Sequence, residues 1–174
     1  MTDMYQSVSD QMDSLTKLIS LVPGFSGYVK RENRRAADKL VREAVANRFE
    51  ELWKRVSNVQ ADLVAAGKIE HVDDLEKAGI QLRTFADKIR TAPRGYSGVF
   101  DAVKVNEKEL EQLYQFDLAF FDLASDIGRG IDNVEASAGD EAALPATIRN
   151  IITLARQAVE TYNRRTETIT GSSK

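Results

Sequence analysis

Apolar residues recur along this chain at alternating spacings of three and four, which is the period of an amphipathic α-helix, and sustained strand alternation is not found. The first stripe, which we expect to face the core, is Tyr5, Val8, Met12, Leu15, Ile19 and Val22. It stops at Pro23-Gly24, because proline disfavours helix at the preceding residue and glycine permits an unusual turn. The chain therefore opens with a helix that ends in a sharp corner.

A second, much longer stripe runs from about residue 30 to residue 66 and is followed by Gly67, a natural C-terminal stop. At roughly 1.5 Å per residue, such a helix would be about 55 Å long. That is longer than a compact domain of this size requires. We therefore expect this helix to project, to bend or to be shared with a partner.

Three more helices follow. The third is predicted to open at Asp73, with Glu76 three residues later as a capping box, and Pro93 closes it. The fourth is expected over about 106–136 and the fifth over about 140–166. The pattern predicts an all-α, single-domain bundle of about five helices over residues 1–169, built as two helix-loop-helix units plus a closing helix. We expect residues 170–174 to form a flexible tail.

A short motif, Gly-aromatic-Ser-Gly, occurs at 24–27 and again 71 residues later at 95–98. A proline precedes each copy of the motif and an aromatic residue follows it. Two similar helix-loop-helix corners are the favoured interpretation, with their aromatic residues filling the core. Binding of an anion by exposed amides is the alternative, because the glycines have a GxxG spacing ahead of a helix. The predicted corner residues are Gly24, Phe25, Gly27, Tyr28, Gly95, Tyr96, Gly98 and Phe100.

The net charge of −3 hides an uneven distribution. Residues 30–55 hold nine Lys and Arg against five Asp and Glu, whereas residues 101–141 hold three against eleven. These segments either pair with each other inside the bundle or present opposite faces to partners. The cations that open the second helix are predicted to lie on an exposed face, opposite the apolar stripe, and are candidates for partner binding or for a solvated surface. They are Arg31, Arg34, Arg35, Lys39 and Arg42.

Asp117 is the sharpest single polar residue, because it falls inside a wide apolar arc of the fourth helix. A carboxylate in such surroundings must find donors or shift its pKa. We expect a structural pair with an arginine, for example Arg48 or Arg83, or with the free amides of a glycine loop. A functional carboxylate is the alternative.

Few enzyme classes fit the sequence. The absence of cysteine among 174 residues excludes disulfides, thiolate metal sites and a cysteine nucleophile, and suits a cytoplasmic location. The single histidine, His71, lacks the Glu-x-x-His setting of a di-metal bundle, and we expect it to lie in a surface turn. No phosphate-binding or dinucleotide motif occurs, and neither a membrane-spanning segment nor a signal peptide is predicted. We expect a protein that is not an enzyme and needs no cofactor.

Three segments carry a resemblance: residues 21–28 (LVPGFSGY), 95–105 (GYSGVFDAVKV) and 113–117 (LYQFD). Together they resemble an uncharacterised family of bacterial helical proteins that pair Pro-Gly-aromatic-x-Gly-Tyr with Gly-Tyr-x-Gly-Phe-Asp-Ala. The resemblance covers roughly residues 20–135. It implies a fold of its own and no known activity, so no catalytic residue is carried over.

These observations favour a cytoplasmic protein-interaction or scaffold module, which presents the long second helix to a protein partner or to a second copy of itself. A peripheral membrane module is the first alternative, in which the basic start of that helix meets anionic headgroups. The second alternative is a small-ligand or anion site at the glycine corners. The overall acidity argues against a nucleic-acid binder.

Overall fold

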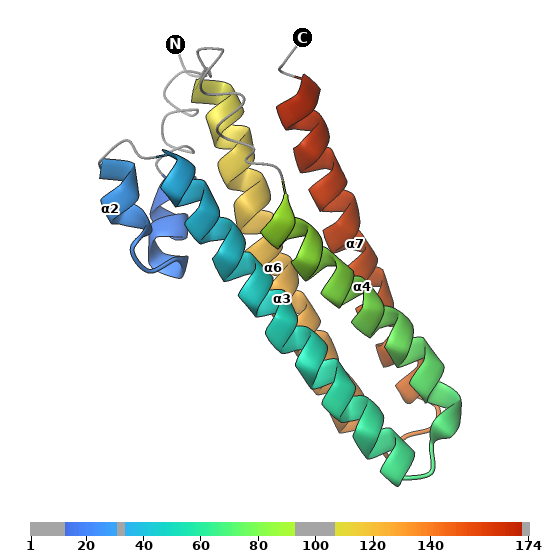
Figure 1. Ribbon diagram of the computed structural model, residues 1–174. Coiled ribbons are helices and arrows are strands. Elements are labelled where there is room, and N and C mark those ends of the chain that lie inside the picture. Colours follow the sequence, from blue (N-terminus) through green and yellow to red (C-terminus); the bar gives the residue numbers. More distant parts are fainter. Residues whose placement is uncertain (1–12, 31–33, 93–106, 172–174) are drawn as a thin grey trace.

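The protein is described here from a computed structural model, which places residues 13–30, 34–92 and 107–171. Every regular element in these ranges is a helix, which confirms the all-α class (Figure 1). The second glycine corner, with Gly95, Tyr96, Gly98 and Phe100, lies outside the described residues, as does Arg31.

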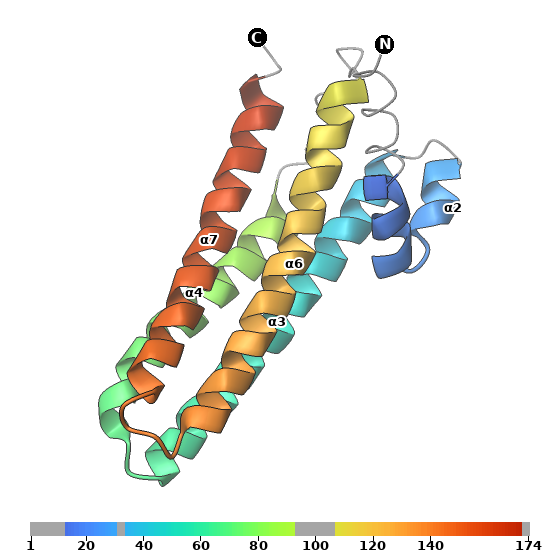
Figure 2. The same ribbon diagram turned by 180° about the vertical axis from the view of Figure 1, so that it is seen from behind.

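Four long helices form the bundle: α3 (Arg34–Ala65), α4 (Val72–Thr91), α6 (Glu107–Ser137) and α7 (Leu144–Gly171). They pack in a ring in which α3 contacts α4, α4 contacts α7, α7 contacts α6 and α6 contacts α3. The pairs α3–α4 and α6–α7 are antiparallel hairpins whose corners lie at the same end of the molecule (Figures 1 and 2). We call that the lower end, and the end where α3 begins and α7 ends the upper end.

The lower corners follow from local chemistry. The α3–α4 corner contains Gly67, whose φ of 77° is costly for residues with a Cβ, and the short 3-10 helix η1 (Ile69–His71). At the α6–α7 corner, Asp140 Oδ1 accepts hydrogen bonds from the backbone N–H groups of Ala142 and Ala143, at 2.9 and 3.1 Å. This side chain satisfies amides that precede α7.

The core runs the whole length of the bundle. Its middle is a cluster of tilted and edge-to-face rings, in which Phe85 lies 4.1 Å from Phe49, 5.2 Å from Phe120 and 6.3 Å from Tyr162, centroid to centroid. Apolar residues of α3 are buried from Ala37 at its start to Leu63 near its end. The long helix is therefore covered by α4 and α6 throughout, and it does not project from the bundle.

A smaller helical corner lies against α3 and α6 at the upper end (Figure 2). It consists of helical residues 13–21 and the short helix α2 (Phe25–Lys30). Ser14 Oγ donates a 2.7 Å hydrogen bond to Glu111 Oε1 of α6, and the ring of Phe25 meets that of Tyr114 edge to face. These contacts fix the corner on the bundle.

Helix 13–21 is rotated relative to the sequence prediction. Ser14 and Leu18 are its buried residues, whereas Ile19, which was predicted to face the core, is 39% exposed. Two other residues of the predicted stripe are as expected, since Leu15 packs against the core and Val22, just after the helix, is buried. Both series have helical spacing, so the pattern alone did not separate them. The contact between Ser14 and Glu111 accompanies the observed rotation.

Two helix termini also differ from the prediction. Helix α4 begins at Val72 with His71 as its N-cap, without a side-chain capping bond, so the predicted Asp73–Glu76 capping box is wrong. Asp73 and Asp74 instead lie in the first turn, where carboxylates favour the helix dipole. Helix α7 continues to Gly171, past the predicted end at 166 and into the segment assigned to the flexible tail.

Candidate functional site

The basic start of α3 does not form one exposed face. Lys39 is exposed and pairs with Glu43, at 3.7 Å, on the surface of the helix. Arg42 is only 7% exposed, so the prediction that it faces solvent is wrong. The reason is that the end of α4 covers this side of α3 at the upper end, and the wheel of one helix contains no such information. Arg34 and Arg35 are the first residues of α3, and their side chains do not belong to the described part of the structure.

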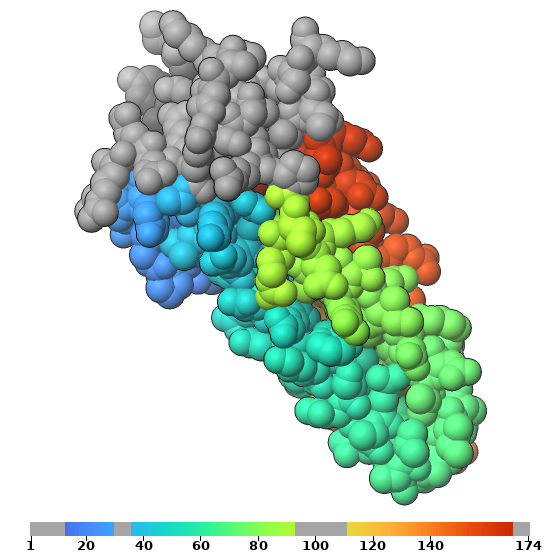
Figure 3. Space-filling view, in the orientation of Figure 1, coloured from blue at the N-terminus to red at the C-terminus, as the bar shows by residue number. Residues whose placement is uncertain are grey.

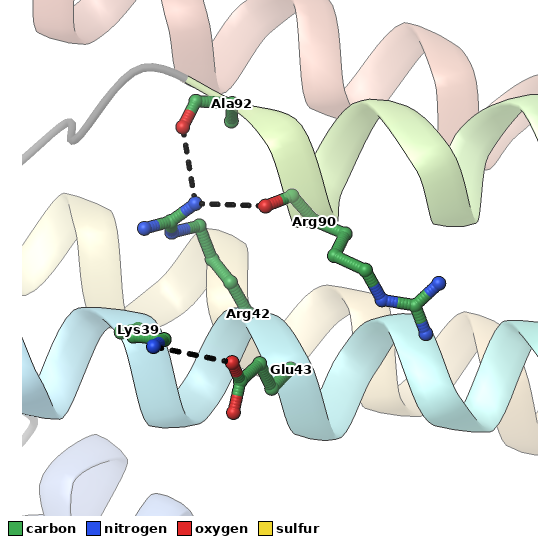
Figure 4. Close-up of a pocket in the computed structure, with 5 residues that line it drawn as sticks. All are labelled: Lys39, Arg42, Glu43, Arg90 and Ala92. Atoms are coloured by element: carbon green, nitrogen blue, oxygen red, sulfur yellow. Dashed lines mark hydrogen bonds and ion pairs between the residues drawn. The ribbon is translucent and has the colours of Figure 1, made fainter.

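Arg42 closes the end of α4. Its Nε donates to Asp38 Oδ2 at 2.9 Å, and its Nη1 lies 3.0 Å from the carbonyl oxygen of Ala92 and 3.4 Å from that of Arg90. Figure 4 shows the side chain reaching from α3 to these two carbonyls. The last carbonyls of a helix lack partners within the helix, and a cation is favourable there. Arg42 therefore serves as a long-range C-terminal cap of α4.

A second arginine completes a buried charge network. Arg165 of α7 donates from Nε to Asp117 Oδ1 at 3.0 Å and from Nη2 to Asp38 Oδ1 at 3.3 Å. The side chains of these three residues are no more than 3% exposed. The network, defined as Asp38, Arg42, Asp117 and Arg165, is formally neutral and joins α3, α6 and α7 to the end of α4.

The prediction that Asp117 is buried and paired with an arginine is confirmed, but the partner is not one of the two examples proposed. Arg48 is exposed beside Glu51, and the Arg83 guanidinium lies over the ring of Trp53 at 5.2 Å. The true partner, Arg165, is on α7, which the sequence pattern did not associate with this site.

Burial raises the pKa of Asp38 from its ordinary value of 3.8 to about 6. The positive charges of Arg42 and Arg165 oppose this change, and the nearby carboxylate of Asp117 adds to it. The desolvation of this carboxylate thus outweighs its two ion pairs.

The first glycine corner is partly as predicted. Phe25 is 2% exposed and belongs to the core, and Tyr28 packs against the core. Gly24 has a φ of 84°, which favours glycine. Gly27 lies in the first turn of helix α2 without a positive φ, so the backbone there does not require a glycine. Its backbone N–H donates to the carbonyl of Gly24 and is therefore used within the corner.

One surface hollow, of about 230 Å³, lies where α3 meets the end of α4 (Figure 4). Figure 3 shows these two helices side by side on this face of the molecule. The lining of the hollow is polar, with Lys39, Arg42, Glu43, Arg90 and Ala92. Each cation already has an anionic partner, since Arg90 pairs with Glu50, Lys39 with Glu43 and Arg42 with Asp38. The hollow is thus electrostatically balanced by the protein itself.

A second hollow, of about 260 Å³, lies on the opposite seam, between α3 and α6, beside the end of helix 13–21. We call it the α3–α6 groove. Apolar side chains form much of its lining, and three charged side chains come from α3. The lining residues are Leu21, Arg48, Glu51, Leu52, Arg55, Phe121, Ala124, Ser125 and Gly128.

The charged residues of this groove differ in how firmly they are held. Arg55 crosses from α3 to α6, where its Nη2 lies 2.6 Å from Asp132 and 3.5 Å from Glu135. Hydrogen bonding to Asp132 raises the pKa of Arg55. Arg48 and Glu51, in contrast, are 63% and 69% exposed and approach each other only to 4.0 Å. The charge of Arg55 on α3 is therefore neutralised by carboxylates of α6, whereas the charges of Arg48 and Glu51 stay exposed on the rim of the groove.

The remaining candidates carry less chemistry. His71 lies in η1, with Nε2 3.6 Å from a carboxylate oxygen of Glu70. Among the described residues, no cluster of His, Asp and Glu has the arrangement of a metal site. The helices that the structure describes also include none that is long and apolar enough to cross a membrane. Glu111, whose partners are Ser14 and Gln115, is a buried carboxylate that the sequence analysis missed.

Comparison of the chain with protein-family models, with curated proteins and with solved structures gave no match. The resemblance to a bacterial helical family therefore stays a prediction, and any functional argument must start from the surfaces described above.

Proposed function

We propose that this chain is a non-enzymatic, cytoplasmic protein-interaction module that docks its partner in the α3–α6 groove. The observation that carries this proposal is a hollow with a partly apolar lining and a charged rim, in which Leu21 is 44% exposed and the largely buried Leu52 and Phe121 form part of the floor. Protein interfaces commonly join a central apolar anchor to a polar rim, and helices often dock in apolar grooves between other helices. The groove has both properties.

One helix of the chain already packs along the seam between α3 and α6. At the upper end, helix 13–21 lies against α3 and α6 and buries Leu18 and Val22 in the common core (Figure 2). The helix ends at Leu21, which also lines the α3–α6 groove. The groove thus continues a seam that is filled by a helix above and left open below, and a partner would extend the same mode of packing.

The two other interpretations from the sequence receive less support. A membrane module that uses the basic start of α3 would have fewer cations to offer, since Arg42 is buried and Lys39 is paired with Glu43. An anion site that includes Asp117 has less support, because this carboxylate is buried and already accepts a hydrogen bond from Arg165.

A photo-crosslinking experiment tests the proposal. Ser125, which is exposed and lines the groove, would be replaced by benzoylphenylalanine in the protein expressed in its native cells. The matched control is Thr153, an exposed residue of α7, a helix that does not line the groove. We expect stoichiometric protein adducts at position 125 and none at position 153, with circular dichroism unchanged for both variants.

Mass spectrometry of the adducts gives the result that would overturn the proposal. Equal labelling at the two positions, lipid adducts at position 125, or no adduct there at all would each rule out the groove as a protein-docking surface.

A further inference from the structure

We infer that the partner in the α3–α6 groove is a second copy of this chain, related to the first by a two-fold axis. This inference rests on the proposed function and adds the identity of the occupant. A two-fold interface requires one surface patch to be complementary to itself, so that residue i meets residue j and residue j meets residue i. The face that contains the groove has this property in both shape and charge.

The shape is that of a knob beside a hollow. Helix 13–21 and α2 stand out from the side of the bundle (Figure 2), and the end of that helix exposes Ile19 and Leu21, at 39% and 44%. The groove next to it has a volume of about 260 Å³. An apolar cavity of about 150 Å³ already accommodates benzene, so a leucine side chain with neighbouring groups fits this space. Leu21 forms one wall of its own groove, and in a two-fold dimer its exposed part would at the same time project into the groove of the other copy.

The charges follow the same logic. Arg48 and Glu51 are one helical turn apart on the groove rim, are both largely exposed and carry opposite signs. At 4.0 Å their mutual contact is at the limit of an ion pair, so each is able to turn toward a partner. A two-fold axis between two such rims brings Arg48 of one copy to Glu51 of the other, and the reverse pair forms at the same time.

Other charged residues of the neighbourhood are less suited to this exchange. Arg55 is bound to Asp132 at 2.6 Å, and Lys54 to Glu50 at 3.3 Å.

A stable interface buries about 800 Å² on each partner, which exceeds the area of the groove alone. The dimer must therefore also include the protruding corner, and we expect its formation to depend on protein concentration.

Sedimentation velocity of the full chain over a concentration series tests the inference with a charge exchange. The variants Arg48→Glu and Glu51→Arg each give positions 48 and 51 the same sign, and we expect each to weaken self-association at least about tenfold. An equimolar mixture of the two variants restores opposite charges across the axis and should recover the dimer. Lys88→Glu, a charge reversal at an exposed site on α4, is the control and should not change the association.

Leu21→Asp provides a second, independent variant, because it removes the knob without changing the rim. It should also abolish the dimer, and circular dichroism of each variant reports whether the fold is intact.

Several outcomes would overturn the inference. They are a wild-type protein that stays monomeric up to several hundred micromolar, a dimer that both single variants retain, or a dimer that their mixture does not restore. A monomeric protein whose position 125 still crosslinks to a different protein would overturn the second copy as occupant but leave the proposed function standing. A monomer without any adduct at that position would contradict both.

Discussion

The buried charge network near the upper end and the aromatic middle of this bundle are held together by different chemistry. The middle is a cluster of phenylalanine rings, among them Phe49 and Phe85, where other apolar side chains of similar volume and shape would be tolerated. The upper end buries two carboxylates and two guanidinium groups, which are stable there only in one arrangement of hydrogen bonds. Buried side chains can therefore be exchanged for similar ones in one region of the bundle and require specific partners in another.

The largest effect is expected from removing one arginine of the network. Arg165→Met leaves Asp117 and Asp38 without their shared donor while it retains most of the apolar volume. Breaking a buried ion pair in this way typically costs about 3–5 kcal/mol, and urea denaturation would measure the loss. Arg164→Met, at an exposed position of the same helix, is the matched control and should change stability by no more than about 0.5 kcal/mol.

The double variant Asp117→Leu with Arg165→Met sharpens this comparison. It removes both members of the closest α6–α7 pair, and apolar replacement of a whole buried pair is often neutral or stabilising. We expect the double variant to be more stable than Arg165→Met alone. If it were as unstable as the single variant, the loss of the bond from Arg165 to Asp117 would not be what destabilises Arg165→Met.

A moderate effect is expected from pH, and its sign is opposite to ordinary acid denaturation. The folded pKa of Asp38 is about 6, above its ordinary value of 3.8, so the folded state binds the proton more tightly than the unfolded state. The stabilisation from protonation is complete below about pH 3.8 and is lost as the pH rises through about 6. Between pH 7 and pH 5, Asp38 should therefore add about 1 kcal/mol to the free energy of unfolding.

Asp38→Asn isolates this contribution from those of the other carboxylates, since the amide does not titrate. Parallel urea titrations of both proteins at pH 5 and pH 7 would give the difference. Should the wild type not gain stability relative to the variant on acidification, Asp38 does not have a raised pKa in the folded state.

The smallest effect separates the two glycines of the first corner. Gly24→Ala forces a Cβ into a φ of 84° and should destabilise the fold by about 1 kcal/mol. Gly27→Ala should be neutral or stabilising by up to about 1 kcal/mol, because Gly27 is helical and a Cβ there meets no atom within 4 Å. Thermal unfolding of the pair decides the matter, and equal melting temperatures would contradict this assignment of the turn.

Local pattern was a good guide to the helices and a poor guide to their rotation and pairing. The extent of α3 and the position of Gly67 after it follow from periodicity and from a glycine stop. The rotation of helix 13–21 did not, because the series of Leu15 and Ile19 and that of Ser14 and Leu18 both fit a helical period. Only the neighbouring helices select between two such faces.

The candidate site shows the same division. The apolar arc of the fourth helix was enough to indicate a buried, paired Asp117, since an isolated carboxylate is unstable in such surroundings. The sequence pattern could not identify Arg165 as its partner, because Arg165 lies 48 positions from Asp117. It could not predict the burial of Arg42 either, because Ala92, whose carbonyl Arg42 binds, lies 50 positions away. Contacts at that separation depend on how the hairpins pack. The α3–α6 groove likewise exists only where two helices and the end of a third meet.

By itself, the sequence determined the helical class, the span of the long helix and the need of Asp117 for a partner, because helical period, helix stops and desolvation act over a few residues. The tertiary structure decided which side of each helix is covered, which arginine reaches which carboxylate and where an apolar surface stays open. These properties depend on the relative placement of elements far apart in the chain. The spacing of residues along one helix does not contain that placement.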